Sequence, residues 1–243
     1  MTRDLRPRPG TAIHQFSFVD ALVAGLYEGA FAASDVLGQS DHGLGCGEAL
    51  DGEIVVLDGT AFVCRDDGTV QRLDASAPIP FAEMVRFEPT HVERIEDMDA
   101  RALELRIDEL VPSRNLFYAV RVDGAFDRMT VREAARQQQP YRGLAQAVAD
   151  QHEDSASSTV GSVFGFRGPE VFQGLSVADW HLHYLDDERT LGGHVMNFRL
   201  RSGSLAIQAL SEFTVHLPEV DSYLDAALDH HDSDAAIRQA EGS

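Results

Sequence analysis

One segment of the chain, Trp180–Phe198, constrains the fold more than any other. It carries three histidines, His181, His183 and His194. Residues two apart in a β-strand point to the same face. The polar stretch Asp186–Gly193 is typical of a hairpin connection, and a turn at its middle sets His194 directly across from His183. The segment therefore predicts a β-hairpin that gathers three imidazoles on one face.

Three imidazole nitrogens with an open fourth position are typical of a catalytic zinc site, because a structural zinc fills all four positions with protein ligands. The residues that alternate with the histidines, Trp180, Leu182 and Tyr184, are apolar, so the opposite face of the strand is expected to be buried. A His-x-His pair alone is more often a surface pair or a hydrogen-bonded pair than a metal site. With the third histidine at hairpin register, a site in which all three bind Zn²⁺ and a cluster without metal fit the geometry equally well.

Composition excludes several classes of partner. The formal net charge is −20, which opposes binding to nucleic acid or to an anionic membrane. An anionic substrate therefore needs a site with local positive charge. The apolar run Phe16–Phe31 is interrupted by Asp20 and Glu28, so it fits neither a signal peptide nor a membrane span. The two cysteines, Cys46 and Cys64, do not make a disulfide framework, and a cytoplasmic protein is expected.

The order of predicted elements indicates an α+β protein of two domains. Residues 1–12 are rich in arginine and proline and predict a flexible N-terminal arm. Residues 13–151 predict a domain with a mixed β-sheet and helices. The polar, serine-rich segment His152–Thr159 is the predicted linker. Residues 160–243 then predict a C-terminal domain with an antiparallel sheet, which carries the metal site, and a helical acidic tail.

Within the first domain, local patterns predict particular elements. Hairpins are expected around Glu53–Leu73 and across an Asp123-Gly124 turn, because Asp-Gly between apolar runs favours tight turns. The apolar spacing in Asp97–Val111 predicts an amphipathic helix. The glycine-rich stretch His42–Gly52 lacks the lysine of a phosphate-binding loop, so a backbone turn that approaches a site is the expectation there.

Five segments, taken together and in order, resemble the alpha-acetolactate decarboxylase family. They are ALVAGLYEG (Ala21–Gly29), HGLGCGEALDGEIVVLDG (His42–Gly59), REAARQQQPY (Arg132–Tyr141), GSVFGFRGPEVFQGL (Gly161–Leu175) and HLHYLDDERTLGGHVMNF (His181–Phe198). The resemblance implies a zinc enzyme that converts 2-acetolactate, a small 2-hydroxy-3-keto acid, to acetoin and CO2. It also implies a two-domain fold that forms a homodimer.

The same resemblance assigns roles to individual residues. The family's metal ligands fall on the three histidines of the predicted hairpin. Its active-site glutamate falls on Glu53, its arginine on Arg132, and a glutamate near its C-terminus on Glu241. Arg132 is then expected to hold the substrate carboxylate, and either Glu53 or Glu241 to donate the proton that replaces CO2. Taken without the resemblance, Arg132 fits a surface ion pair at a strand end, and Glu53 fits an exposed residue that opens a strand.

The chain departs from the family at two places. Cys46-Gly47 stands where the family has threonine and a larger apolar residue, and Asp179-Trp180 stands where it has glycine and an aromatic residue. These changes affect the expected rim of the pocket and not the metal ligands. Cys46 is expected to line the pocket without binding zinc.

Three other kinds of protein fit parts of the pattern. A cupin-like metal enzyme would use His181, His183 and Glu188, but its last histidine would come from a second motif much further along the chain. A zinc hydrolase would use a metal-bound hydroxide on an ester or amide. A metal-binding module without catalysis would have no need of Arg132.

Overall fold

The computed structural model describes residues 5–38, 40–228 and 235–238, and most of this part of the chain is β-structure. The first sheet has the strand order β14-β1-β8-β3-β4-β5-β6. Its strands are β1 (Ala12–Phe16), β3 (His42–Cys46), β4 (Glu53–Leu57), β5 (Thr60–Cys64), β6 (Val70–Arg72), β8 (Phe81–Val85) and β14 (Glu212–His216). All neighbours are antiparallel except β1 and β14, which are parallel.

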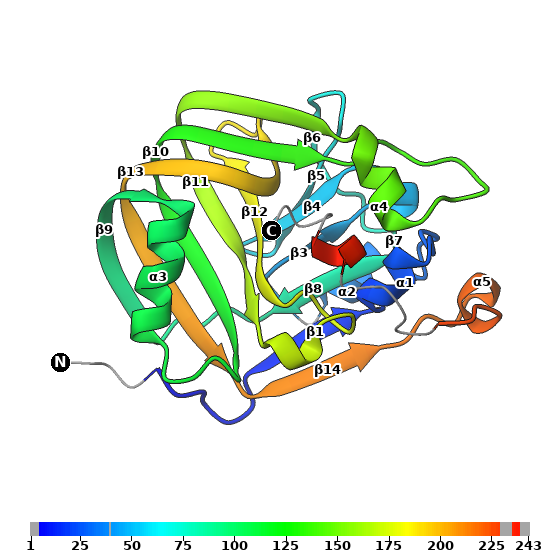
Figure 1. Ribbon diagram of the computed structural model, residues 1–243, viewed down its shortest axis with the longest axis horizontal. Coiled ribbons are helices and arrows are strands. Elements are labelled where there is room, and N and C mark those ends of the chain that lie inside the picture. Colours follow the sequence, from blue (N-terminus) through cyan, green and yellow to red (C-terminus); the bar gives the residue numbers. More distant parts are fainter. Residues whose placement is uncertain (1–4, 39, 229–234, 239–243) are drawn as a thin grey trace.

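The second sheet has the order β10-β11-β12-β13-β9, with a further pairing of β10 to β13 that closes a ring of four strands. Its strands are β9 (His91–Asp99), β10 (Phe117–Glu133), β11 (His152–Gly168), β12 (Asp179–Asp186) and β13 (Gly192–Leu210). Figure 1 shows these long, curved strands beside the flatter first sheet. A small ribbon of β2 (Phe31–Ala32) and β7 (Pro78–Ile79) completes the β-structure of the described residues.

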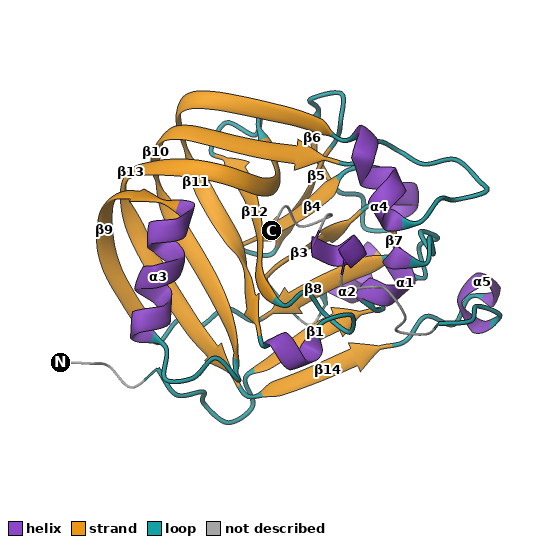
Figure 2. Cartoon of the chain, viewed as in Figure 1, coloured by secondary structure: helices purple, strands orange, loops and turns teal. Residues whose placement is uncertain are grey.

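The helices are short. They are α1 (Val19–Val23), α2 (Ala33–Leu37), α3 (Ala100–Leu110), α4 (Leu144–Ala147) and α5 (Asp221–Leu224). Helix α3 lies over the second sheet, and the other labelled helices lie toward the opposite side of the molecule (Figure 2). The predicted amphipathic helix corresponds to α3, which begins where the Asp99 side chain accepts a hydrogen bond from the Ala102 N–H. No helix among the described residues is long and apolar enough to cross a membrane.

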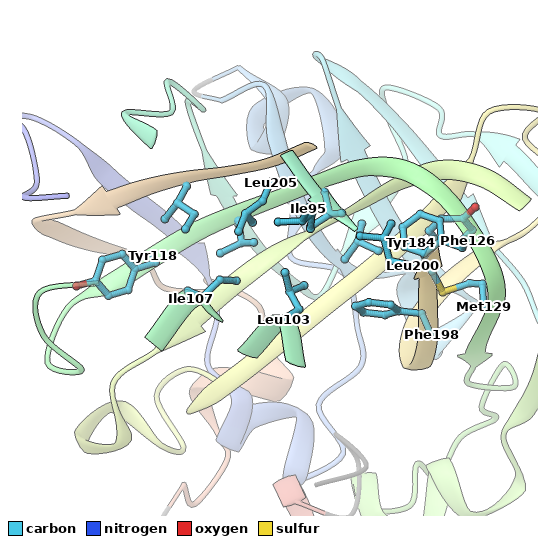
Figure 3. Close-up of a cluster of buried hydrophobic side chains, with 14 of the residues drawn as sticks. Ile95, Leu103, Ile107, Tyr118, Phe126, Met129, Tyr184, Phe198, Leu200 and Leu205 are labelled. Atoms are coloured by element: carbon cyan, nitrogen blue, oxygen red, sulfur yellow. The ribbon is translucent and has the colours of Figure 1, made fainter. Parts of the chain in front are cut away.

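Three apolar layers hold these elements together. Residues of α3, among them Leu103 and Ile107, pack inside the curve of the second sheet against Tyr118 and Phe198 (Figure 3). A second layer lies between the two sheets and contains Leu44, Val55, Phe164, Phe166 and Leu185. The third covers the outer face of the first sheet, where α2 packs on β4 and β5. A further apolar cluster, which includes Val19, Leu22 and Leu50, lines the functional site.

The expected division into two domains is wrong in its boundaries. The predicted linker, His152–Thr159, is the first half of β11 and pairs with β10. Strands β9 and β10 precede residue 151 yet belong to the second sheet, and β14 follows residue 160 yet lies in the first. The predicted linker is polar because most of its side chains, in this half of β11, are exposed.

One predicted turn lies inside a strand, and the turn predicted for His42–Gly52 is confirmed only in its second half, at Glu48–Leu50. Asp123-Gly124 lies inside the continuous strand β10, where Gly124 is paired with Gly161 on one side and Gly203 on the other. A Cβ on Gly124 would lie 2.6 Å from the Ser202 carbonyl oxygen, so this glycine permits close strand contact. The first residues of the glycine-rich segment form β3, and a Cβ on Gly43 would lie 2.4 Å from the Glu83 carbonyl oxygen.

Candidate metal centre

The three predicted histidines come together as the hairpin register requires. Strand β12 carries His181 and His183, and β13 carries His194, which is paired with His183. One ligand nitrogen from each ring can be chosen so that all lie within 4.8 Å of one another, and all three residues are buried. The ring centroids are 5.2, 5.4 and 5.5 Å apart. The three imidazoles therefore form a compact cluster between the two sheets.

The turn that fixes this register is held by Asp186. One oxygen of its carboxylate accepts hydrogen bonds from the backbone N–H groups of Thr190 (2.8 Å) and Leu191 (3.0 Å). The other oxygen accepts a hydrogen bond from the Thr190 hydroxyl at 2.7 Å. A shift of the β12–β13 register by one residue would move His194 to the opposite face of β13. The three histidines therefore come together only if this turn keeps its observed length.

Two of the rings are oriented through their Nδ1 atoms by the first sheet. His183 Nδ1 lies 2.8 Å from the Ile54 carbonyl oxygen, and His181 Nδ1 lies 3.0 Å from Glu83 Oε2. A carbonyl oxygen only accepts hydrogen bonds, so Nδ1 of His183 carries the proton and Nε2 keeps its lone pair. Metal-binding histidines are held in this way in many proteins.

The protonation of His183 also fits a metal ligand. Burial, followed by the neighbouring His181, lowers the pKa of His183 well below its usual value. The ring is therefore neutral at pH 7, which is the form that binds metal. Its Nε2 is buried and has no hydrogen-bond partner in the described part of the chain. A cation at the centre of the cluster would satisfy this nitrogen, so these residues fit the expected group.

Glu53 and Arg132 are both buried beside the cluster, in contrast to the surface positions that their strand ends would suggest. Glu53 opens β4, and its Oε2 lies 3.5 Å from His183 Nε2. Arg132 lies near the end of β10, opposite His194, and its Nη1 is 3.6 Å from Glu53 Oε1. The side chains of Arg132 and Glu53 are only 4% and 11% exposed. A cation and a carboxylate thus stand side by side at the histidines.

A pocket opens on this group and is otherwise mostly apolar. His181, His194, Glu53 and Arg132 form its polar end. The remaining walls come from Val19, Leu22, Leu50, Phe81, Ala134, Leu144, Val148 and Val177, with Gly45 and Cys46 from β3. Cys46 lines the pocket, and burial raises the pKa of its thiol, so the side chain stays protonated. It does not belong to the histidine cluster.

The predicted rim residues, Asp179 and Trp180, lie at the start of β12. Asp179 is exposed and opens β12 with a φ of 59°, while Trp180 packs against the apolar layer under α3. Glu241 lies outside the described residues. Closer to the pocket, Ile237, in the helical turn 235–238, is 1% exposed and packs with Leu22 and Leu50. The described end of the tail therefore reaches the pocket wall.

One contact of the site was absent from the sequence-based prediction. Glu83 holds His181 and lies inside β8, and no motif in the sequence marks it as part of a site. The available signal was a single carboxylate between Ala82 and Met84 in an otherwise apolar strand. Such a residue fits a solvent-facing position as well as a buried one, so the pattern alone does not identify it.

The chain is similar to known proteins over nearly its whole length. A sequence model of the alpha-acetolactate decarboxylase family matches residues 13–230. The alpha-acetolactate decarboxylase of Methylococcus capsulatus is 37% identical over 94% of this chain and 88% of its own length. That of Bacillus subtilis strain 168 is 32% identical over 100% of this chain and 96% of its own. Its crystal structure superposes with a TM-score of 0.93, covering 96% of this chain and 100% of the other. The chain therefore belongs to the alpha-acetolactate decarboxylase family, a family of carboxy-lyases.

Proposed function

We propose that this protein converts 2-acetolactate to acetoin and CO2 at a zinc ion bound by His181, His183 and His194. The observation that carries the proposal is the buried Nε2 of His183, which faces the cluster without a hydrogen-bond partner in the described residues. A buried polar atom without a partner is costly, and a metal ion supplies one. Three histidines, with room for further ligands, suit zinc.

The reaction breaks the bond between the carboxylate carbon and the carbon that carries the hydroxyl group. The electron pair of that bond stays on the hydroxyl-bearing carbon and spreads into the neighbouring ketone. A bound zinc supplies positive charge that stabilises the negative charge developing on the ketone and hydroxyl oxygens. The substrate provides its own electron sink, so thiamine or pyridoxal cofactors are not required. One proton must then reach the same carbon to give acetoin.

Arg132 binds the substrate carboxylate and orients the breaking bond. Its guanidinium is the buried cation at the polar end of the pocket, and a planar guanidinium can form two parallel hydrogen bonds to a carboxylate. Holding the bond in line with the ketone favours its cleavage. The net charge of −20 repels an anionic substrate, and the positive charge of Arg132 attracts it within the pocket.

Glu53 is the proposed proton donor. The carboxyl group of Glu53 lies between Arg132 and His183. A substrate carboxylate bound by Arg132 would therefore be released as CO2 close to Glu53. Once Glu53 has taken up a proton from solvent, it can deliver that proton to the carbon that CO2 has just left. The family resemblance supports Glu241 as a second candidate for this step. The apolar walls exclude water from the reacting carbon.

The proposal is tested by incubating the purified protein with racemic 2-acetolactate and measuring acetoin and CO2, with and without a chelator. We expect about one zinc per chain and activity that is lost on chelation and restored by zinc. His183→Ala should lose both metal and activity. His152→Ala, which changes an exposed histidine, is the matched control. A protein that releases no CO2 but hydrolyses esters would support the zinc hydrolase instead.

We further propose a cytoplasmic homodimer. The family resemblance supports the dimer. Cys46 and Cys64 are both buried and unpaired, which suits a reducing compartment. Light scattering after size exclusion measures the oligomeric state directly, and a monomeric mass would contradict the dimer.

A further inference from the structure

Glu83 lies in the middle of β8 with a side chain that is completely buried. Both of its carboxylate oxygens have partners from other parts of the chain. Oε2 lies 3.0 Å from His181 Nδ1, and Oε1 accepts a hydrogen bond from the Ser176 hydroxyl group. Ser176 is itself buried and lies in the loop before β12. Both contacts are thus made from the segment that leads into the histidine hairpin.

A buried carboxylate at this position is expensive for the fold. Its neighbours on the same sheet are Leu44 in β3 and Gln15 in β1, neither of which carries a charge. His181 is its only ion-pair partner in the part of the chain that the structure describes. An apolar residue of similar size would usually pack there at no loss of stability, because burying a carboxylate costs several kcal/mol before its interactions are counted.

The position of His181 explains why a carboxylate is nevertheless useful here. His181 belongs to the histidine cluster, and because its Nδ1 contacts Glu83, its Nε2 is the nitrogen left for a cation. A proton held on Nδ1 leaves the lone pair on Nε2, and a negative charge behind the ring makes Nε2 a better donor to a cation. His183 differs in this respect, because its Nδ1 meets the neutral carbonyl oxygen of Ile54.

We infer that Glu83 is a positioning residue that sets the affinity of the histidine cluster for its metal, at the expense of the stability of the metal-free protein. The carboxylate fixes the tautomer of His181 and places a buried negative charge behind the ring, which attracts a cation bound at the cluster. This inference rests on the metal site of the proposed function, but not on the substrate or on the decarboxylation.

The test is Glu83→Gln, which keeps the size of the side chain and an oxygen that can accept the hydrogen bond from His181. Zinc affinity is measured by titrating the metal-free protein in competition with a chelator of known affinity. Thermal unfolding of the metal-free protein is measured in parallel. We expect zinc to bind about 10 to 100 times more weakly, as for other residues that orient metal ligands. The melting temperature of the metal-free variant should be unchanged or higher, because a buried charge has been removed.

Two further variants separate the contributions. Ser176→Ala removes the hydroxyl group that fixes the Glu83 side chain but keeps the charge, so zinc affinity should fall by only a few-fold. Glu170→Gln removes an exposed carboxylate and should leave zinc affinity unchanged.

The outcomes distinguish this inference from the proposed function. Equal zinc affinity in Glu83→Gln and wild type would overturn the role of Glu83. A metal-free Glu83→Gln protein that melts well below wild type, or fails to fold, would also overturn it, because Glu83 would then stabilise the fold itself. A wild-type protein that binds no zinc would instead refute the metal site.

Discussion

Glu133 should make the protein less stable as the pH rises. It ends β10 with only 2% of its surface exposed, and its Oε2 has no hydrogen-bond partner in the described part of the chain. Burial first, and then the charges of Asp154 and Glu53, raise the pKa of Glu133 from 4.5 to about 8. At pH 7 the carboxyl group is therefore mostly protonated in the folded protein and ionised in the unfolded chain.

The sign and size of the effect follow from this difference. Below pH 4.5 both states hold the proton, so Glu133 imposes no penalty. Between pH 4.5 and about 8 the unfolded chain releases the proton first, and the free energy of unfolding falls with rising pH until it levels off above pH 8. This difference in pKa between the folded and unfolded states lowers the free energy of unfolding by about 5 kcal/mol if the surroundings of the carboxyl group stay rigid, and by less if they relax.

The variant Glu133→Gln removes this dependence, because glutamine has the shape of the protonated acid and does not ionise. Urea unfolding at pH 5, 7 and 8.5, in the presence of a chelator, measures the free energy of unfolding without a contribution from metal release. Relative to wild type, the variant should gain little at pH 5 and several kcal/mol at pH 8.5. Glu188→Gln, at an exposed position in the hairpin turn, controls for the loss of one charge. A difference between Glu133→Gln and wild type that does not change with pH would refute the reasoning.

Three further variants test the walls of the site. Arg132→Lys keeps the charge but loses the planar guanidinium, so kcat/KM should fall by about tenfold or more, and unchanged kinetics would remove Arg132 from substrate binding. Cys46→Thr should keep its zinc and most of its activity, since the thiol is protonated, and zinc loss on elemental analysis would indicate a thiolate ligand. Gly193→Ala should lower both the melting temperature and zinc affinity. Its Cβ would lie 2.8 Å from the Arg132 carbonyl oxygen at a φ of 150°, beside His194. A variant with wild-type melting and zinc binding would show that this strand can shift.

The histidine cluster could be predicted because its three residues lie in one hairpin, within a short segment of the sequence. Alternation along one strand and the length of one turn fix which residues of the hairpin face each other. The burial of Glu53 and Arg132 is not local, since it depends on which strands from distant parts of the chain meet at the cluster. Only the family resemblance indicated their role. Glu83 required both the order of strands in the first sheet and the packing of the two sheets, so it was missed.

The same distinction explains the errors in the fold. The hairpin predicted at the start of Glu53–Leu73 is confirmed, since β4 and β5 pair across Asp58-Gly59. An identical dipeptide at Asp123-Gly124 lies within a strand, because it meets glycines on both neighbouring strands and the chain passes straight through. A dipeptide specifies a turn only where no neighbouring strand continues beside it.

The pairing of β14 with β1 also bears on how the protein is made. During synthesis β1 emerges from the ribosome about 200 residues before β14, so the first sheet gains this strand only after those residues have been made. The long separation of these partners slows folding, because a large loop must close before the contact forms. Fragments cut near residue 155 would each carry part of both sheets, with strand edges left open to other chains. The protein is therefore expected to fold after translation as one cooperative unit.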